Sequence, residues 1–84
     1  MASTTDFVIR VLEEKLQLSA DELSADVALG SSGLDLESIA LIELGAHCEE
    51  GLGVVIPDED YGRLPRMTVR EFAEYLDARA VAEV

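Results

Sequence analysis

The sequence predicts an all-α fold, a small antiparallel bundle of three main helices plus one short helix, with a long loop between the first and second main helices. The 84-residue chain is 49% hydrophobic, whereas disordered acidic segments are poor in apolar residues. Its apolar residues are almost all aliphatic and recur between carboxylates, as in amphipathic helices. A chain this short is expected to form one domain over residues 1–84, with an ordered core of about residues 5–79.

The first main helix is expected from Thr5 to Leu18. Its apolar positions follow helical spacing: Val8, Val11, Leu12 and Leu16. A threonine, Thr4 or Thr5, is expected to cap its N-terminus.

The loop Ser19–Asp35 is rich in serine and glycine, which favour turns and caps. Ser19 is expected to cap one short helical turn, Ala20–Leu23. Four aliphatic residues punctuate the loop and predict that it packs on the domain: Leu23, Val27, Leu29 and Leu34. A loop of this length in a small domain often has a function.

The second main helix is expected from about Glu37 to Gly51, with Gly51 in the left-handed conformation that ends many helices. Polar residues gather at its start, where hydroxyls and negative side chains satisfy or stabilise unpaired N–H groups. Taken alone, Ser38 at this position is expected to be a cap.

The segment Leu52–Ile56 is expected to be an extended connector, followed by one helical turn at Asp58–Tyr61. The acidic residues of that turn resemble a calcium loop only superficially. Such a loop requires glycine at its sixth position and glutamate at its twelfth, and this chain has Arg63 and Val69 there. The sequence therefore predicts no calcium site.

The last helix is expected to start at Thr68 with a capping box, in which Thr68 and Glu71 each accept a hydrogen bond from the other's N–H group. It is expected to run to about Arg79, followed by a frayed tail to Val84.

Eighteen acidic residues against six basic ones give a formal net charge of -12. This charge repels nucleic acids and anionic membranes and favours proteins with basic patches. Three arginines, Arg63, Arg66 and Arg70, form a small basic cluster that is expected to pair with nearby carboxylates. No apolar run reaches membrane-spanning length and no signal peptide is evident, so a cytoplasmic monomer that does not bind membranes is expected.

The chain has a single cysteine, Cys48, and a single histidine, His47. An intrachain disulfide, a cysteine-based metal site and a Ser-His-Asp triad are therefore not expected. Cys48 lies on the apolar stripe of its helix and is expected to pack in the core, while His47 is expected at the surface. Carboxylate pairs would need a pocket for acid–base catalysis, and so small a domain offers little room for one.

The stretch Gly33–Leu44 resembles the modification site of acyl carrier proteins and peptidyl carrier proteins, in which an Asp-Ser-Leu tripeptide opens a helix. The acidic connector at residues 55–60 and the start of the last helix match the same family in order. The resemblance implies a carrier without catalytic residues of its own, with 4′-phosphopantetheine attached covalently to Ser38. Acyl or aminoacyl intermediates would be held as thioesters on this arm.

The same resemblance implies that the second helix is the docking surface. The partners would be a phosphopantetheinyl transferase, acyl- or aminoacyl-loading enzymes, and synthases and transferases with basic docking patches. The residues that would dock these partners are Glu37, Ile39, Ile42, Glu43, Glu49 and Glu50.

Three residues beside Ser38 depart from the family's usual pattern. Glu37 stands where Asp is usual, Asp35 where Gly is common, and Ile39 where Leu is usual. The change at Ile39 is milder, and the departures at Asp35 and Glu37 favour a specialised pathway, such as polyketide or nonribosomal-peptide synthesis, over housekeeping fatty-acid synthesis. Met1 and the absence of flanking linkers favour a discrete carrier protein over a module of a larger enzyme. The alternatives are an acidic helical interaction module that is never modified and a small carboxylate-dependent hydrolase.

Overall fold

A computed structural model describes residues 3–82 of the chain, with side chains for residues 3–80. It confirms the all-α prediction: the described residues form three α-helices and two 3₁₀ helices. In chain order these are α1 (Thr4–Glu14), η1 (Ala20–Glu22), α2 (Ser38–Leu52), η2 (Asp58–Arg66) and α3 (Val69–Ala82). β-Pairing within residues 3–82 is confined to one isolated bridge, between Ala28 and Thr68.

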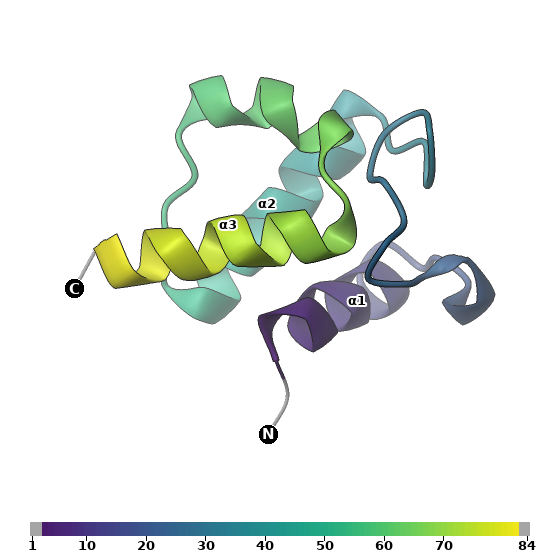
Figure 1. The fold of residues 1–84 in the computed structure, drawn as a ribbon, viewed down its shortest axis with the longest axis horizontal. Coiled ribbons are helices and arrows are strands. Elements are labelled where there is room, and N and C mark those ends of the chain that lie inside the picture. The colour runs from purple at the N-terminus through teal and green to yellow at the C-terminus, as the bar shows by residue number, and fades with distance from the viewer. Residues whose placement is uncertain (1–2, 83–84) are drawn as a thin grey trace.

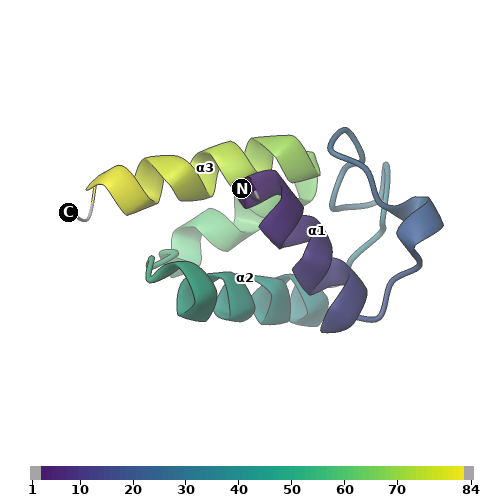
Figure 2. The ribbon, with the colours of Figure 1, turned by 90° about the horizontal axis from the view of Figure 1, so that it is seen from below.

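The three α-helices enclose one core, and α1 lies diagonally across α2 and α3 (Figures 1 and 2). α1 runs against the other two, whereas α2 and α3 run in the same general direction because η2 leads the chain back between them (Figures 1 and 2). The core is aliphatic apart from one aromatic ring and one thiol. Its fully enclosed side chains are Val8, Leu12, Leu29, Leu44, Cys48, Leu64, Val69, Phe72 and Leu76.

Both ends of α1 differ from the prediction. Ser3 is the N-cap, in place of Thr4 or Thr5, because it forms a capping box with Asp6. The helix ends at Glu14, four residues before Leu18. The reason lies in the turn that follows: Gln17 adopts a left-handed conformation (φ 59°), which interrupts helical hydrogen bonding.

The loop between α1 and α2 is fastened to the rest of the domain, as its aliphatic residues predicted. Ser19 caps η1, also as predicted. Leu29 is fully buried, and the loop runs beside the segment that leads into α3. Four backbone hydrogen bonds join them: Leu29 N–Met67 O (2.9 Å), Gly30 N–Pro65 O (3.1 Å), Val69 N–Val27 O (2.9 Å) and Arg70 N–Ala25 O (2.8 Å).

α2 ends at Leu52, one residue beyond the predicted end, and its left-handed cap lies two residues later than predicted. The left-handed residue is Gly53 (φ 69°), whose N–H donates to the Glu49 carbonyl, while Gly51 lies inside the helix. Both glycines are candidates for a C-terminal cap by composition. The ring of Phe7 covers the Gly51 position, so tertiary packing of α1 on α2 accompanies the continuation of the helix.

An extended connector is confirmed over residues 54–57, whereas Leu52 belongs to α2. η2 extends five residues beyond the single turn predicted at Asp58–Tyr61. A 3₁₀ helix has three residues per turn, so Tyr61 and Leu64 lie on the same face. Leu64 is fully buried and Tyr61 is partly buried against the core. Burial of this face stabilises a longer helix than the local sequence indicates.

A glycine inside α2 allows η2 to lie close to it. A Cβ atom at Gly45 would lie 2.7 Å from Cε1 of Tyr61, closer than real Cβ contacts allow. The ring of Tyr61 therefore occupies the space that any other residue at position 45 would fill.

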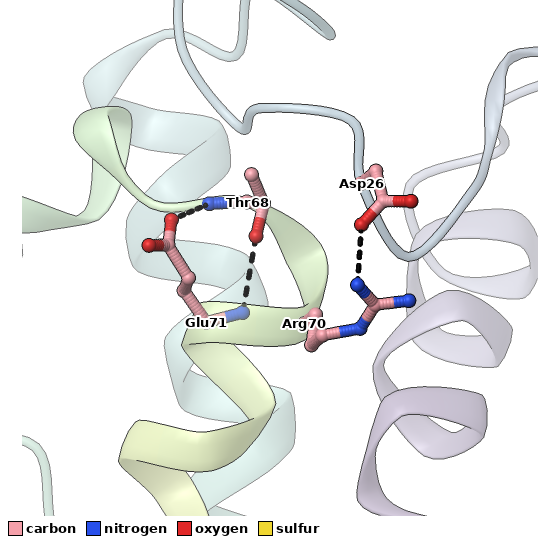
Figure 3. Close-up of polar contacts among 4 residues, drawn as sticks. All are labelled: Asp26, Thr68, Arg70 and Glu71. Atoms are coloured by element: carbon pink, nitrogen blue, oxygen red, sulfur yellow. Dashed lines mark hydrogen bonds and ion pairs between the residues drawn. The ribbon is translucent and has the colours of Figure 1, made fainter.

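The predicted start of α3 is confirmed. The Thr68 N–H donates to Oε1 of Glu71 (2.9 Å), and the Glu71 N–H donates to Oγ1 of Thr68 (3.1 Å), as Figure 3 shows. α3 continues to Ala82, three residues beyond the predicted end at Arg79, and the remainder of the predicted frayed tail lies outside the described residues.

Candidate functional site

Ser38 is the first residue of α2 and its side chain is exposed. The residue before it, Glu37, is the N-cap: its backbone is extended (φ -78°, ψ 168°), and its carbonyl accepts a hydrogen bond from the Leu41 N–H (2.9 Å). Ser38 is therefore not the cap that its position suggested. Within the described part of the chain its hydroxyl has no hydrogen-bond partner.

The start of α2 lacks a side-chain cap. Glu37 makes no capping hydrogen bond, and the first turn of α2 contains no acidic residue. The N–H groups of Ser38, Ile39 and Ala40 precede the first intrahelical bond and have no partner within the helix. Free N–H groups and the positive end of the helix dipole favour an anion at this position.

The segment before Ser38 is held in place by the backbone. The N–H of Leu36 donates to the Leu29 carbonyl (3.0 Å), and the N–H of Asp35 donates to the Gly30 carbonyl (2.7 Å). Asp35 is left-handed (φ 56°), a conformation that Asp tolerates better than most residues. Since Leu29 is a core residue, the start of α2 is tied directly to the core.

Ser38 borders a small hollow of about 210 Å³ between α2 and η2. The other residues that line it are mainly apolar: Leu41, Ile42, Tyr61, Gly62 and Pro65. Burial, followed by the nearby charges of Glu49 and Asp58, raises the pKa of Tyr61, so its hydroxyl stays neutral at physiological pH.

Five of the six predicted docking residues are exposed and lie at three places along α2. Glu37, Ile39 and Glu43 lie on the first turns of α2 near Ser38, and all are exposed; the side chain of Ile39 is 70% exposed. Ile42 is 54% exposed and lines the hollow beside Tyr61. Glu50 is exposed at the far end of the helix.

Glu49 differs from the other predicted docking residues. It is only partly exposed, and its carboxylate accepts a hydrogen bond from the Ile56 N–H at 2.7 Å. This bond joins the last turn of α2 to the connector, which gives Glu49 a structural role. A docking role for Glu49 stays a prediction.

Cys48 is fully buried, which confirms its packing role. Burial, and secondarily the charge of Glu49, raises its pKa to about 12, so the thiol is not a nucleophile at neutral pH. His47 is only partly exposed and borders a groove with Phe7 between α1 and α2, so it is less exposed than predicted.

Two of the three clustered arginines pair with carboxylates, as predicted. Arg70 contacts Asp26 at 2.6 Å (Figure 3), and Arg63 contacts Asp60 at 3.7 Å. Arg66 is exposed and forms no ion pair within residues 3–80.

The described residues contain no group of three or more His, Cys, Asp or Glu side chains that could hold a metal ion. Within the same range, every helix is too short or too polar to cross a membrane.

Sequence reasoning missed Tyr61, which borders the Ser38 hollow and contacts α2. The available signal was its three-residue spacing from Leu64 within an otherwise polar segment, which matches the period of a 3₁₀ helix.

Comparisons with known proteins identify relatives of this sequence. The family described as "Phosphopantetheine attachment site" matches residues 6–76, which include Ser38. The chain is also similar to a protein of Rhodococcus erythropolis named "Acyl carrier protein". The two are 29% identical over 80 residues, which cover 90% of this chain and 85% of the relative.

Proposed function

We propose that Ser38 carries the covalently attached 4′-phosphopantetheine of this chain, which belongs to the family of phosphopantetheine attachment-site proteins. Its cofactor is 4′-phosphopantetheine, and the protein is a carrier without catalytic activity of its own. The terminal thiol of the bound arm supplies the chemistry, holding cargo as a thioester. The uncapped start of α2, with the exposed Ser38 hydroxyl at its first position, is the observation that supports Ser38 most strongly.

The residues around Ser38 suit a phosphodiester. Its hydroxyl gives up no hydrogen bond when it is modified, because it makes none within the described residues. The free N–H groups of the first turn stabilise the added negative charge. The chain itself thus contributes an accessible hydroxyl and a favourable field.

We further propose that the cargo is an acyl or aminoacyl group of a specialised pathway, such as polyketide or nonribosomal-peptide synthesis. Asp35 and Glu37, which depart from the usual family pattern, support specialisation, and the name of the Rhodococcus relative supports acyl cargo. The partners are a phosphopantetheinyl transferase, loading enzymes and synthases with basic patches, and the location is cytoplasmic. The net charge of -12 suits such partners.

Incubation of the chain with coenzyme A and a broad-specificity phosphopantetheinyl transferase, followed by intact-mass measurement, tests the proposal. One phosphopantetheine group is expected on the wild-type chain and none on Ser38→Ala. Ser32→Ala is the matched control, since Ser32 is also exposed but lies in the loop. A wild-type chain that gains no mass would favour an unmodified interaction module, and a modified Ser38→Ala would place the arm elsewhere.

A further inference from the structure

The seam between α2 and η2 begins at Ser38 and follows one face of α2. The residues of α2 that line it are spaced four or three apart and therefore share a face: Ser38, Ile42, Ala46 and Glu49. Two hollows lie along the seam. The near hollow, of about 210 Å³, borders Ser38, and the far hollow, of about 510 Å³, borders Ala46 and Glu49. Ile42 and Tyr61 line both hollows, so their side chains lie at the boundary between the two.

The ring of Tyr61 is packed tightly against α2 at this boundary. A Cβ atom at Gly45 would lie 2.7 Å from Cε1 and 2.8 Å from Cζ of the ring, closer than real Cβ contacts allow. Leu44 and Leu64 are fully buried, so the core fills the space on the inner side of the seam. A chain that continued past the ring would have to cross the exposed side of Ile42, in contact with solvent.

Tyr61 is held in this position by contacts on both sides of it along the chain. The Tyr75 hydroxyl donates a hydrogen bond to Asp60, the residue before Tyr61. Further along η2, the Pro65 carbonyl accepts a hydrogen bond from the Gly30 N–H (3.1 Å). η2 is thus fastened both to α3 and to the loop between α1 and α2, and its ring is part of a fixed element.

The two hollows differ in size and in chemistry. Apart from Ser38 and the Tyr61 hydroxyl, the near hollow has an apolar lining. A cavity of about 150 Å³ holds one benzene molecule, so the near hollow has room for a group of about that size. The far hollow is larger, but it is bordered by the carboxylates of Glu49 and Asp58, which must keep their water and so disfavour an alkyl chain beside them.

We propose that Tyr61 sets the size of the cargo group that the seam can shelter: a group of about one aromatic ring rests in the near hollow, and a longer alkyl chain is kept in solvent. This inference rests on the proposed attachment of the arm to Ser38. The far hollow extends to Glu49, eleven residues and so about 16 Å along the helix from Ser38. A fully extended arm reaches about as far, at the rise per bond of an extended polypeptide. Both hollows are therefore within reach of the cargo, and Tyr61 separates them.

The first test compares an octanoyl with an acetyl thioester on the arm of Ser38, each loaded from its coenzyme A derivative by a broad-specificity transferase. In the wild-type chain the exchange of acetyl for octanoyl is expected to leave the amide NMR signals of Leu44, Gly45 and Leu64 unchanged. In Tyr61→Ala, where the two hollows join, the same exchange is expected to shift these signals. Hydroxylamine is expected to cleave the octanoyl thioester of Tyr61→Ala about fourfold more slowly than that of wild type, the factor given by net burial of one methylene group.

Phe7→Ala is the matched control, because Phe7 is a half-buried ring that lies over another glycine of α2, Gly51, and lines neither hollow. It is expected to behave as wild type in both measurements. Circular dichroism checks folding, and Tyr61→Val, which loses less buried surface, takes the place of Tyr61→Ala if the latter unfolds. An octanoyl chain that is sheltered equally with and without the ring, or exposed in both cases, would overturn the proposal.

A cargo series on the wild-type chain tests the size limit itself. A benzoyl thioester is expected to shift the amide signals of Leu41 and Gly62, which line the near hollow. Its cleavage by hydroxylamine is expected to be about fourfold slower than that of benzoyl pantetheine free in solution, for the same degree of burial. The octanoyl thioester is expected to be cleaved as fast as its free counterpart. The reverse order, with octanoyl protected and benzoyl not, would contradict a limit set by Tyr61.

Attachment through a new thiol separates this inference from the proposed function. Ser38→Cys alkylated with N-octyl iodoacetamide carries an octyl chain at the same position without a transferase. The native thiol of Cys48 does not compete, because it is fully buried and its pKa is about 12. Alkylation is expected to shift the amide signals of Gly45 and Leu64 only when Tyr61→Ala is also present. If the wild-type chain never gains phosphopantetheine, the proposed function fails. Shifts with and without the ring, or in neither case, would instead show that Tyr61 does not close the seam.

Discussion

The N-termini of α2 and α3 each have a hydroxyl residue at or next to the start of the helix but differ in structure. At α3, the side chains of Thr68 and Glu71 each accept a hydrogen bond from the other's N–H group (Figure 3). Arg70, the second residue of α3, forms an ion pair with Asp26 in the loop between α1 and α2. At α2, the N-cap is Glu37, which makes no capping bond, and the hydroxyl of Ser38 has no partner within the described residues. The start of α3 is therefore capped by its own side chains, whereas the start of α2 has no side-chain cap.

The difference follows from one position in each sequence. A threonine at the N-cap is short enough for its oxygen to reach the N–H groups of the first turn, whereas glutamate is not among the residues that cap well. Ser38 has a suitable hydroxyl but lies one position too late, inside the helix. The start of α2 thus lacks the stabilisation that a cap supplies, and its N–H groups remain available for an anion.

The largest expected effect comes from removing the cap of α3. Thr68→Ala is expected to lower the free energy of unfolding by about 1 kcal/mol, because the Glu71 N–H loses its partner. Glu37→Ala at α2 is the matched change and is expected to stay within about 0.5 kcal/mol of wild type, since no capping bond is lost. Urea denaturation followed by circular dichroism measures both. A similar loss in the two variants would mean that Glu37 does stabilise α2.

Adding a side-chain cap to the start of α2 is expected to have a somewhat smaller effect, of opposite sign, on the free energy of unfolding. Glu37→Asp places a good N-cap residue before Ser38 and is expected to raise the free energy of unfolding of the unmodified chain by roughly 0.5 kcal/mol. Attachment of the arm is expected to stabilise the wild-type chain by about 0.5 kcal/mol, and Glu37→Asp by less, because the new carboxylate and the phosphodiester compete for the same N–H groups. Denaturation of both chains before and after modification measures this. An equal gain in both would show that the phosphodiester does not use these groups.

The ion pair that joins the first loop to α3 is expected to contribute less. Asp26 and Arg70 are both largely exposed, so solvent screens their attraction, and Asp26→Asn is expected to cost about 0.3 kcal/mol. The difference from wild type should disappear in 1 M salt. A difference that persists there would point to a role of Asp26 other than ion pairing.

A pH effect is expected at the hydrogen bond that joins α3 to η2. Burial, then the hydrogen bond from Tyr75 to Asp60, raises the pKa of Tyr75 from its ordinary 10.0 to about 12. The folded state therefore holds this proton more tightly than the unfolded state. The contribution is complete below pH 10 and is lost as the pH rises through 12. Tyr75→Phe is expected to lose stability less steeply over pH 10–12 and to show no altered pH dependence near pH 7. Identical slopes would argue against this coupling.

Much of the fold could be predicted because its signals are local. The Thr68 capping box, the turn capped by Ser19 and the burial of Cys48 each depend on neighbouring residues or on helical spacing, and all are confirmed. The end of α1 could not be predicted, because Gln17 has no sequence signature of a left-handed residue. η2 was predicted too short because its length depends on burial of Tyr61 and Leu64.

The site divides in the same way. The residue pattern placed Ser38 at the start of a helix, and the family resemblance predicted its role as the attachment residue. The absence of a side-chain cap at Glu37 depends on backbone and side-chain geometry, so it could not be predicted from the sequence. The hollow beside Ser38 was missed because its walls, formed by residues of α2 and of η2, are separated in the chain and meet only after folding.

The contact between Gly45 and Tyr61 limits how this chain can be engineered for heat resistance. Replacement of helical glycine by alanine is a common route to a more stable protein, since it restricts the unfolded chain. At Gly62, where an added Cβ would meet nothing within 4 Å, such a change is expected to be tolerated. At Gly45 the new methyl group would displace the Tyr61 ring and reshape the hollow beside Ser38. Gly62 can therefore be replaced by alanine, whereas Gly45 on the facing helix should be kept. A variant in which both were replaced would alter the space next to Ser38, the proposed attachment point.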